Sequence, residues 1–180
     1  MNKRILNVGC GESCYGTHRL DIIKRKNVTH LGEIEKGLPF KDAYFDEVYA
    51  MSIFEHLGNP LNFLLECKRV LKKGGKLRVW TDNGNWLLFI YNKIKIVHGD
   101  YRYFGDKINE KDMHFQFFQP EHIRNYFWKA GFDRKTIKTE IKSCIEEEGR
   151  GIKLLIIRKL LETIFGKRLG SKWIYAEAKK

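Results

Sequence analysis

The segment from Arg4 to Asp21 constrains the fold of this chain more than any other part of it. It opens with an apolar run that is typical of a buried strand, and Gly9 and Gly11 follow at once. Glycines at these positions allow a sharp turn and let a ligand approach the backbone without a Cβ in the way. The segment ends in an acid, Asp21, which can accept hydrogen bonds from ribose hydroxyls if it lies at the tip of a second strand. The pattern therefore predicts half of a nucleoside pocket.

The spacing within this segment does not fit an ordinary dinucleotide-binding turn. G-x-G-x-x-G would need a glycine at Cys14, and the acid would follow about 20 residues later, after a full helix. Asp21 comes only 10 positions after Gly11. We therefore expect no full helix between Gly11 and the second strand. Taken alone, the glycine pair is equally typical of a tight turn with no ligand.

Four motifs follow in a fixed order. Leu38–Phe40 reads LPF, Phe45–Val48 reads FDEV, Phe54–Leu57 reads FEHL and Arg69–Leu77 reads RVLKKGGKL. This series resembles the class I S-adenosylmethionine-dependent methyltransferases of the type 11-like group, whose pattern is LPF, FDxV, EHL and RVLKPGGxL. The stretch 113–132 resembles the distal part of the same family, so the resemblance covers most of the chain.

The chain departs from the family pattern at several positions. Asn7 stands where many members carry an acid, Ser13 where many carry a third glycine, and Lys73 replaces a proline. The first crossover is also short. These departures leave room for a protein that keeps the fold without the catalysis.

The resemblance implies an α/β fold, with a Rossmann-like seven-stranded methyltransferase sheet. The sheet should be mostly parallel with an antiparallel last strand, and helices should cover both faces. We expect one domain over residues 1–180, in which 84–119 is a lid or substrate insertion. Hydrophobic patterning places strands at 5–8, 18–23, 28–31, 47–51, 76–80, 132–144 and 172–178. The predicted helices are 60–73, capped by Asn59 and closed by Gly74, then 121–130 and 152–165.

The resemblance also implies that S-adenosylmethionine binds at the carboxyl ends of the strands and leaves as S-adenosylhomocysteine. Glu33 occupies the place of an acid that accepts the adenine amino group, and Ile34 would lie against the adenine face. An exposed loop acid is the alternative interpretation of Glu33. The predicted cofactor-binding residues are Asn7, Gly9, Cys10, Gly11, Asp21, Ile22, Glu33, Ile34, Met51 and Ser52.

Candidates for catalytic work at the methyl acceptor are His114, His56 and Asp82. His114 is the strongest, because an imidazole titrates near neutrality and can take up a proton. A structural histidine that bonds a backbone carbonyl is the alternative. In the family, Glu55 and His56 often shape the cofactor pocket.

Only four residues precede the first strand, so we expect the pocket to be covered by the segment 84–119. This segment mixes aromatic and basic side chains, a composition that suits an apolar acceptor with an anionic group, a lipid surface or stacked bases. We expect Trp86, Tyr103 and His114 to face the cofactor. Aromatic residues that fill a small core are the alternative.

Composition limits the partners. The 34 Lys and Arg outnumber the 22 Asp and Glu, which gives a formal net charge of +12 and favours an anionic partner such as RNA, a membrane surface or a phosphorylated substrate. Solubility alone is the alternative. The 4 cysteines form no CxxC pair, so we predict free thiols, no zinc site and no other metal centre. No signal peptide precedes the first strand and no apolar run reaches the ~18 residues of a membrane span, so we expect a cytoplasmic protein.

The sequence therefore predicts an enzyme, a methyltransferase acting on a small-molecule acceptor that carries an anionic group. Two alternatives stay open. One is an RNA-directed methyltransferase, and the other is a non-catalytic module that binds cofactor or nucleic acid on the same fold. A homodimer is compatible with either.

Overall fold

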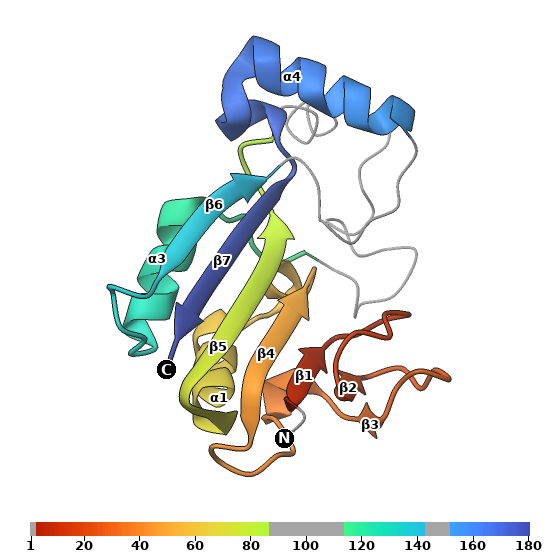
Figure 1. Ribbon diagram of the computed structural model, residues 1–180, viewed down its shortest axis with the longest axis vertical. Helices are drawn as coiled ribbons and strands as arrows, with labels where there is room; N and C mark the ends of the chain where they lie inside the picture. The colour runs from red at the N-terminus through yellow and green to blue at the C-terminus, as the bar shows by residue number, and fades with distance from the viewer. Residues whose placement is uncertain (1–2, 87–113, 143–151) are drawn as a thin grey trace.

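The computed structural model describes residues 3–86, 114–142 and 152–180, and these residues form one seven-stranded sheet (Figure 1). The strand order is β3-β2-β1-β4-β5-β7-β6. Strand β7 runs antiparallel to both of its neighbours, and the other pairings are parallel. The strands are β1 Ile5–Val8, β2 His18–Asp21, β3 His30–Leu31, β4 Phe45–Met51, β5 Leu71–Asp82, β6 Lys138–Lys142 and β7 Trp173–Lys179. The predicted mostly parallel sheet with an antiparallel last strand is confirmed.

Two helices, α1 (Pro60–Val70) and α3 (Pro120–Lys129), pack on one face of this sheet (Figure 1). Side chains alternate between the two faces of a strand, so Leu77 and Val79 of β5 point into the core beneath these helices. Helix α1 begins as predicted, because the Asn59 side chain accepts a hydrogen bond from the amide of Asn62 at 3.0 Å and Pro60 occupies the first turn.

The opposite face of the sheet carries a cluster of buried aromatic side chains, made by Tyr49, Trp80, Trp173 and Tyr175. The sequence predicts helices on both faces, and the described ranges place α1 and α3 on the same one. Charged groups of both signs surround the aromatic cluster. Glu47 pairs with Lys3 and Arg78, so this face is polar around its aromatic centre.

Helix α4 (Ile152–Gly170) lies beyond the end of the sheet (Figure 1). Its predicted end at residue 165 coincides with a break, because Gly166 has a left-handed φ of 72° and the chain bends there. None of the helices in the described ranges is long and apolar enough to cross a membrane.

The connection between β1 and β2 contains no helix, which confirms the short crossover predicted from the position of Asp21. Side chains hold this connection instead. The Asn27 amide donates to the carbonyls of Gly11 at 2.9 Å and Ser13 at 2.8 Å. The glycine turn is therefore fixed from outside by a residue that lies between β2 and β3.

Several predicted boundaries are wrong. Helix α1 ends at Val70 and not at Lys73, because Leu71 already pairs with Phe45 in the sheet. Strand β5 therefore begins at residue 71, and Gly74, with φ of 76°, makes a turn within this strand instead of ending the helix.

Three predicted strands are also too long. Strand β6 begins at residue 138 and not at 132, since Asp133 organises a turn by accepting a hydrogen bond from the amide of Lys135 at 3.0 Å. Strand β2 ends at Asp21, where the carboxylate caps the next turn. Strand β3 is limited to residues 30–31 because the amide of Val28 turns back to the carbonyl of Arg25.

Candidate active site

A cavity of about 280 Å³ opens beside the carboxyl ends of β1, β2 and β4. Ligands bind at this edge in open α/β sheets. The cavity brings together many of the residues predicted from sequence, although they come from separate turns. It is lined by Gly9, Asp21, Ile22, Glu33, Ile34, Glu35, Ile53, His56, Leu57 and Phe115.

Gly9 must be a glycine for a geometric reason. Its φ is +62°, and a Cβ at this position would lie 2.0 Å from the Cδ1 atom of Ile53. The Ile53 side chain therefore rests directly on the backbone of the turn. Gly11 also has a left-handed φ, of +53°, but a Cβ there would meet nothing within 4 Å. Of the two glycines, Gly9 is the one that allows close packing against the cavity wall.

Asp21 is buried at the tip of β2, and its carboxylate fixes two turns. One oxygen accepts a hydrogen bond from the amide of Gly11 at 2.8 Å, and the other accepts from the amide of Ile23 at 2.8 Å. Arg25 also approaches the second oxygen at 3.2 Å. A carboxylate has about four acceptor positions, so Asp21 keeps capacity for a ligand hydroxyl.

Two acids line the other side of the cavity from η1 (Ile34–Lys36) and the residue before it. Glu33 is half-exposed and pairs with Lys36 at 2.8 Å. Glu35 has a structural task, because its carboxylate accepts hydrogen bonds from the amides of Gly58 at 2.8 Å and Asn59 at 3.1 Å. Sequence reasoning overlooked Glu35, which joins this wall to the start of α1.

The remaining predicted cofactor residues lie outside the cavity lining. The buried Asn7 side chain donates to the carbonyl of Tyr15 at 3.2 Å and to the Ser13 hydroxyl at 3.4 Å. Burial, followed by the nearby charge of Asp21, raises the pKa of the Cys10 thiol.

The cavity lining also excludes Met51, Ser52 and Gly11. Met51 packs against the aromatic cluster on the opposite face of the sheet. Ser52 has a left-handed φ of 51°, and its amide donates to the carbonyl of Trp80 at 2.9 Å. The Gly11 amide is bonded to Asp21, as described above.

The three predicted catalytic residues lie together at one side of the cavity, and Glu55 joins them. His56 and His114 meet edge to face, with ring centroids 4.4 Å apart. Asp82 lies at the end of β5, where its Oδ2 atom is 3.9 Å from Nδ1 of His114 and its Oδ1 atom is 3.7 Å from the Lys172 ammonium. His56 itself lines the cavity, so this cluster borders the space where a ligand would sit.

Glu55 is the most deeply buried acid of this cluster, with 2% of its surface exposed. The Thr81 hydroxyl donates to its Oε2 atom at 2.7 Å. Burial, and after it the charge of Asp82, raises the pKa of Glu55 to about 8. Buried carboxyls with a raised pKa are common in functional sites, and they also occur in structural hydrogen-bond networks.

Residues 114–118 form a wall across the ends of β4 and β5. The amide of Phe115 donates to the carbonyl of Glu55 at 2.9 Å, and the Gln116 side chain donates to the carbonyl of Leu57 at 3.2 Å. Beyond the wall, the amide of Gly84 donates to the carbonyl of Phe118 at 2.9 Å. These bonds hold His114 beside His56, although the two are far apart in sequence.

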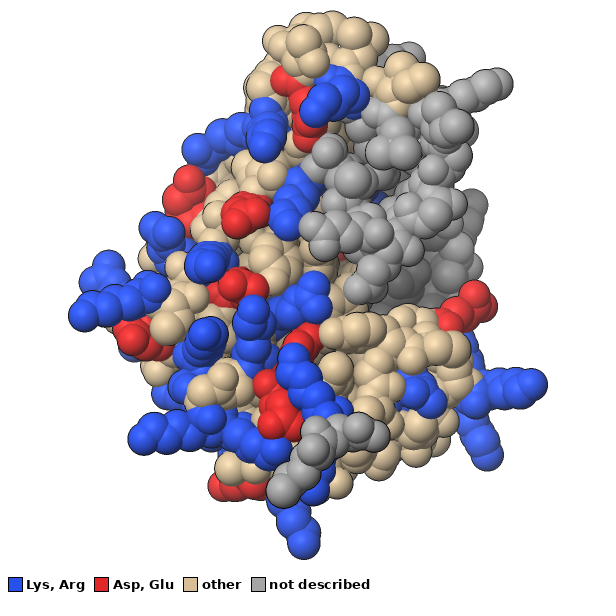
Figure 2. Space-filling model, in the orientation of Figure 1, with Lys and Arg blue, Asp and Glu red and all other residues tan. Residues whose placement is uncertain are grey.

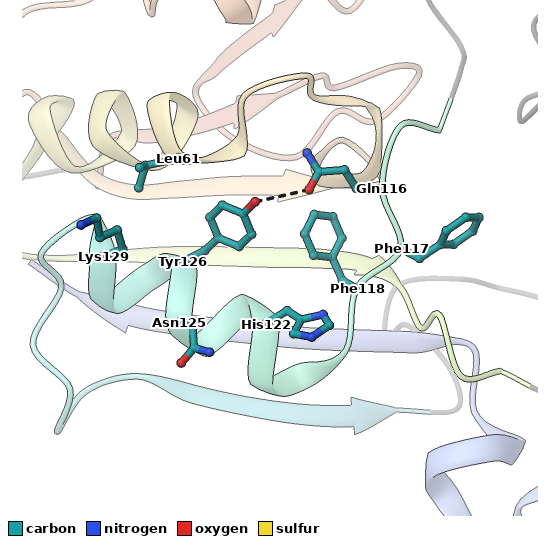
Figure 3. Close-up of a pocket in the computed structure, with 8 residues that line it drawn as sticks. All are labelled: Leu61, Gln116, Phe117, Phe118, His122, Asn125, Tyr126 and Lys129. Carbon is teal, nitrogen blue, oxygen red and sulfur yellow. Dashed lines mark hydrogen bonds between the residues drawn. The ribbon is translucent and has the colours of Figure 1, made fainter.

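A second cavity, of about 400 Å³, lies against α3 and the residues just before it (Figure 3). Tyr126 of α3 points across it, and its hydroxyl donates to the side-chain Oε1 atom of Gln116 at 3.4 Å. The ring of Phe117 points away from the other labelled side chains. This cavity shares no lining residue with the first one. The wall 114–118 thus contributes to both cavities, Phe115 to the first and Gln116 to the second.

Most of the predicted lid lies outside the described residues. Residues 87–113, including Tyr103, belong to that part. The described ends of the segment are 84–86, which contain the half-buried Trp86, and 114–119. Of the three residues expected to face the cofactor, His114 is the one that the described residues place beside the cavity.

Sequence reasoning missed Ile53, Leu57 and Phe115 among the lining residues. Ile53 directly precedes the FEHL motif and Leu57 is its last residue, so the motif is a signal that could have found them. Nothing local marks Phe115, which reaches the cavity through its bond to the Glu55 carbonyl.

Comparisons with known proteins show what this chain is similar to. Residues 15–79 match the family model described as methyltransferase domain. Over 103 residues the chain is 31% identical to a tRNA U34 carboxymethyltransferase of Pseudomonas fluorescens, which corresponds to 44% of this chain and 32% of that protein. The chain spans about half or less of the length of the curated relatives it matches.

Solved structures show the same fold at low identity. A SAM-dependent methyltransferase from Archaeoglobus fulgidus is 20% identical, with a TM-score of 0.63 over 99% of this chain and 86% of that one. Phosphoethanolamine N-methyltransferase 2 of Haemonchus contortus, solved with S-adenosyl-L-methionine, is 16% identical, with a TM-score of 0.63 over 100% of this chain and 49% of that one.

Proposed function

We propose that this chain is a class I S-adenosylmethionine-dependent methyltransferase, which transfers a methyl group from S-adenosylmethionine to a small-molecule acceptor. One observation carries this proposal. A single cavity at the carboxyl ends of the strands is lined by a glycine of the first turn, the acid at the tip of β2 and the acid before η1. These are the residue types that a nucleoside ligand requires at those places.

Each part of the cofactor has a candidate partner. The Asp21 carboxylate would accept the ribose hydroxyls, in exchange for its contact with Arg25. Glu33 would accept the adenine amino group, with Ile22 and Ile34 on the apolar faces of the base. Gly9 would let the methionine part pass close to the backbone. The cofactor supplies an activated methyl group on a sulfonium sulfur.

For methyl transfer, the protein mainly has to align the acceptor atom with the methyl group and exclude water from the site. The acceptor atom attacks the methyl carbon, and the carbon–sulfur bond breaks with its electron pair going to sulfur. His56, His114 and Asp82 border the cavity where the acceptor would sit. We assign them to holding the acceptor and taking up its proton when it has one to lose. The segment 84–119 completes this proposal as the acceptor lid.

The net charge of +12 supports an acceptor that carries an anionic group. A nucleic-acid acceptor is the second candidate, favoured by the same charge and by the tRNA-modifying relative. The face in Figure 2 shows Lys and Arg interspersed with Asp and Glu, not a patch of one sign. Glu177, for example, pairs with both Lys76 and Lys138. We therefore favour a small-molecule acceptor over a nucleic-acid acceptor.

Ligand-dependent thermal unfolding tests the proposal. A ligand that binds only the folded state raises Tm, by an amount that grows with its concentration above Kd. S-adenosylmethionine and S-adenosylhomocysteine should both raise Tm, while ATP and NAD at equal concentration should not. Equal shifts with all four ligands, or none with the first two, would contradict the assignment. His122→Ala, at an exposed position on α3, is the matched control and should shift like the natural chain.

Binding of a short tRNA fragment separates the two acceptor classes. If nucleic acid is the substrate, affinity should fall steeply as salt rises, because released counterions drive such binding. Weak binding with a shallow salt dependence would leave the small molecule as the acceptor.

A further inference from the structure

Glu55, His56 and His114 each offer one ligand atom, and these atoms all lie within 4.8 Å of one another. Glu55 and His56 belong to the turn η2 (Phe54–His56) after β4, and His114 begins the wall before α3. The hydrogen bond from the Phe115 amide to the Glu55 carbonyl ties the two segments together beside the ligand atoms. The three side chains are thus gathered by the fold, not by sequence spacing.

We propose that Glu55, His56 and His114 bind a divalent transition-metal ion of the zinc class at the acceptor side of the cavity. Two imidazoles and one carboxylate are the donor set of open metal sites, which keep a further position for water or substrate. Ligand atoms in such sites lie roughly 3–4 Å apart at metal–ligand distances of about 2.1 Å, so modest side-chain rotation closes the site.

The burial of the three ligands indicates that the open coordination position of the ion faces the cavity. Glu55 and His114 are 2% and 9% exposed, and so the protein closes the site behind them. His56 is less buried and lines the cavity. A metal ion among the three would therefore present its remaining position to the space beside the cofactor.

The surrounding groups match those that support metal ligands elsewhere. A ligating histidine commonly gives its second ring N–H to a carboxylate, and a ligating carboxylate is itself hydrogen-bonded. Here Asp82 lies 3.9 Å from Nδ1 of His114, and Thr81 donates to Glu55 at 2.7 Å. If Asp82 moves within hydrogen-bond distance and accepts from the Nδ1–H group, Nε2 of His114 is left for the ion.

The sequence predicts no metal centre, but on the ground of cysteine spacing alone. That reasoning has no bearing on a site built from histidine and glutamate. The two histidines are separated by 58 positions, 114 minus 56, so no short motif could reveal the pair.

The role of the ion rests on the proposed function. An acceptor hydroxyl or thiol bound to the ion would lose its proton to solvent more readily, because a bound cation lowers the pKa of its ligand. The acceptor oxygen or sulfur would then form the bond to the methyl carbon, and the cofactor sulfur would leave with the electron pair. This favours a hydroxyl or thiol acceptor over an amine. With the ion bound, His56 and His114 act through it, and this role replaces the proton uptake assigned to them in the metal-free site.

Metal titration tests the site without any acceptor. The whole chain is stripped with a chelator, dialysed, and titrated with Zn²⁺ in competition with a chromophoric chelator. We expect one ion per chain, and Co²⁺ added instead should give the visible absorption of a site with nitrogen and oxygen ligands. The proposal would be overturned if the natural chain bound Zn²⁺ without a stoichiometric endpoint, or bound less than one ion per chain.

Variants identify the ligands. His114→Gln and Glu55→Gln keep side-chain volume and should each weaken Zn²⁺ at least a hundredfold. Asp82→Asn should weaken it by about 10–100-fold, the usual loss for a supporting partner. His122→Ala is the control and should bind like the natural chain. Equal affinity in His114→Gln and the control would contradict the site.

Circular dichroism of each variant separates lost binding from lost fold, and His56→Gln at the less buried position gives a second test in a folded chain. S-adenosylhomocysteine affinity, measured in parallel on metal-free protein, separates this inference from the proposed function. Absence of zinc binding by the natural chain, with intact cofactor binding, would overturn the metal site alone. Zinc binding without cofactor binding would overturn the methyltransferase assignment alone.

Discussion

The carboxylate of Asp21 accepts a hydrogen bond from the backbone amide of Gly11 at 2.8 Å. The tip of the second strand thereby fixes the turn that follows the first strand. In a fold with a full first crossover helix, that helix would begin at this turn and hold it. Here the crossover has no helix, and Asp21 with Asn27 supplies the restraint through side chains. The acid that would bind the ribose is therefore also the one that shapes the glycine turn.

Gly9→Ala should destabilise the protein more than Gly11→Ala, although both residues have left-handed backbone conformations. Each change costs about 1–2 kcal/mol of backbone strain. Only at Gly9 does the new Cβ collide with the Ile53 side chain, at 2.0 Å. We expect Gly9→Ala to lose about 1–3 kcal/mol more than Gly11→Ala, the usual cost of overpacking. Urea unfolding of both variants gives the comparison.

Ile53→Ala supplies the control for this collision. In that background, the cost of Gly9→Ala should fall to that of Gly11→Ala, because only backbone strain remains. A cost at Gly9 that is unchanged by Ile53→Ala would show that the contact is not its cause.

Asn7→Asp should destabilise the chain at neutral pH. The Asn7 amide donates to the Tyr15 carbonyl at 3.2 Å in a buried position, and a carboxylate cannot donate. The expected loss is about 1–3 kcal/mol in the free energy of unfolding. Because a protonated carboxyl can donate, the loss should shrink in acid. Urea unfolding of both chains at two pH values would show this, and a chain as stable as the natural one at pH 7 would refute it.

Glu47→Gln should lower stability at neutral pH and much less in acid. Burial by itself raises the pKa of Glu47, but hydrogen bonds from Lys3, Tyr15 and Arg78 outweigh it and hold the pKa below its usual value. A lowered folded-state pKa contributes stability above the unfolded pKa of about 4.3, and this is lost as the pH falls through the folded value. The expected loss at pH 7 is about 2 kcal/mol.

Urea unfolding at pH 7 and at pH 3 measures the two differences. Glu140→Gln, which removes an exposed carboxylate paired with Lys142 at 3.8 Å, should have little effect at either pH. The same difference for Glu47→Gln at both pH values would contradict the assignment.

Local patterns could predict the strands and the glycine turn, because they depend on short apolar runs and on residues with special backbone freedom. Local patterns gave wrong boundaries where a contact with a residue distant in sequence determines the structure. The signal Lys72-Lys73-Gly74 is typical of a helix end, but Leu71 had already joined the sheet beside Phe45. The local sequence around Gly74 does not show that residue 71 can pair with Phe45 in the sheet instead of continuing the helix.

The same distinction applies to the site. Asp21 ends β2, and Glu33 and Ile34 come shortly after β3, so topology alone brings them to the cavity edge. Phe115 and His114 reach that edge only because the wall 114–118 bonds to the carbonyls of Glu55 and Leu57. Such backbone contacts leave no periodic trace in sequence, and the role of Glu35 as a tie to α1 was missed for the same reason.

Calorimetric titration with S-adenosylhomocysteine, on the natural chain and on Asp21→Ala, tests the central claim most directly. Asp42→Ala, at an exposed position that bonds Arg69, serves as the matched control. Because Asp21 also holds the Gly11 turn, Asp21→Asn is measured too, since its amide oxygen can still accept from Gly11. We predict one site per chain, with affinity weakened about tenfold to 150-fold in Asp21→Ala, which corresponds to about 1.5–3 kcal/mol. Asp21→Asn should fall between Asp21→Ala and the natural chain, and Asp42→Ala should match the natural chain. Equal affinity in all four proteins, or no binding to the natural chain, would contradict the account.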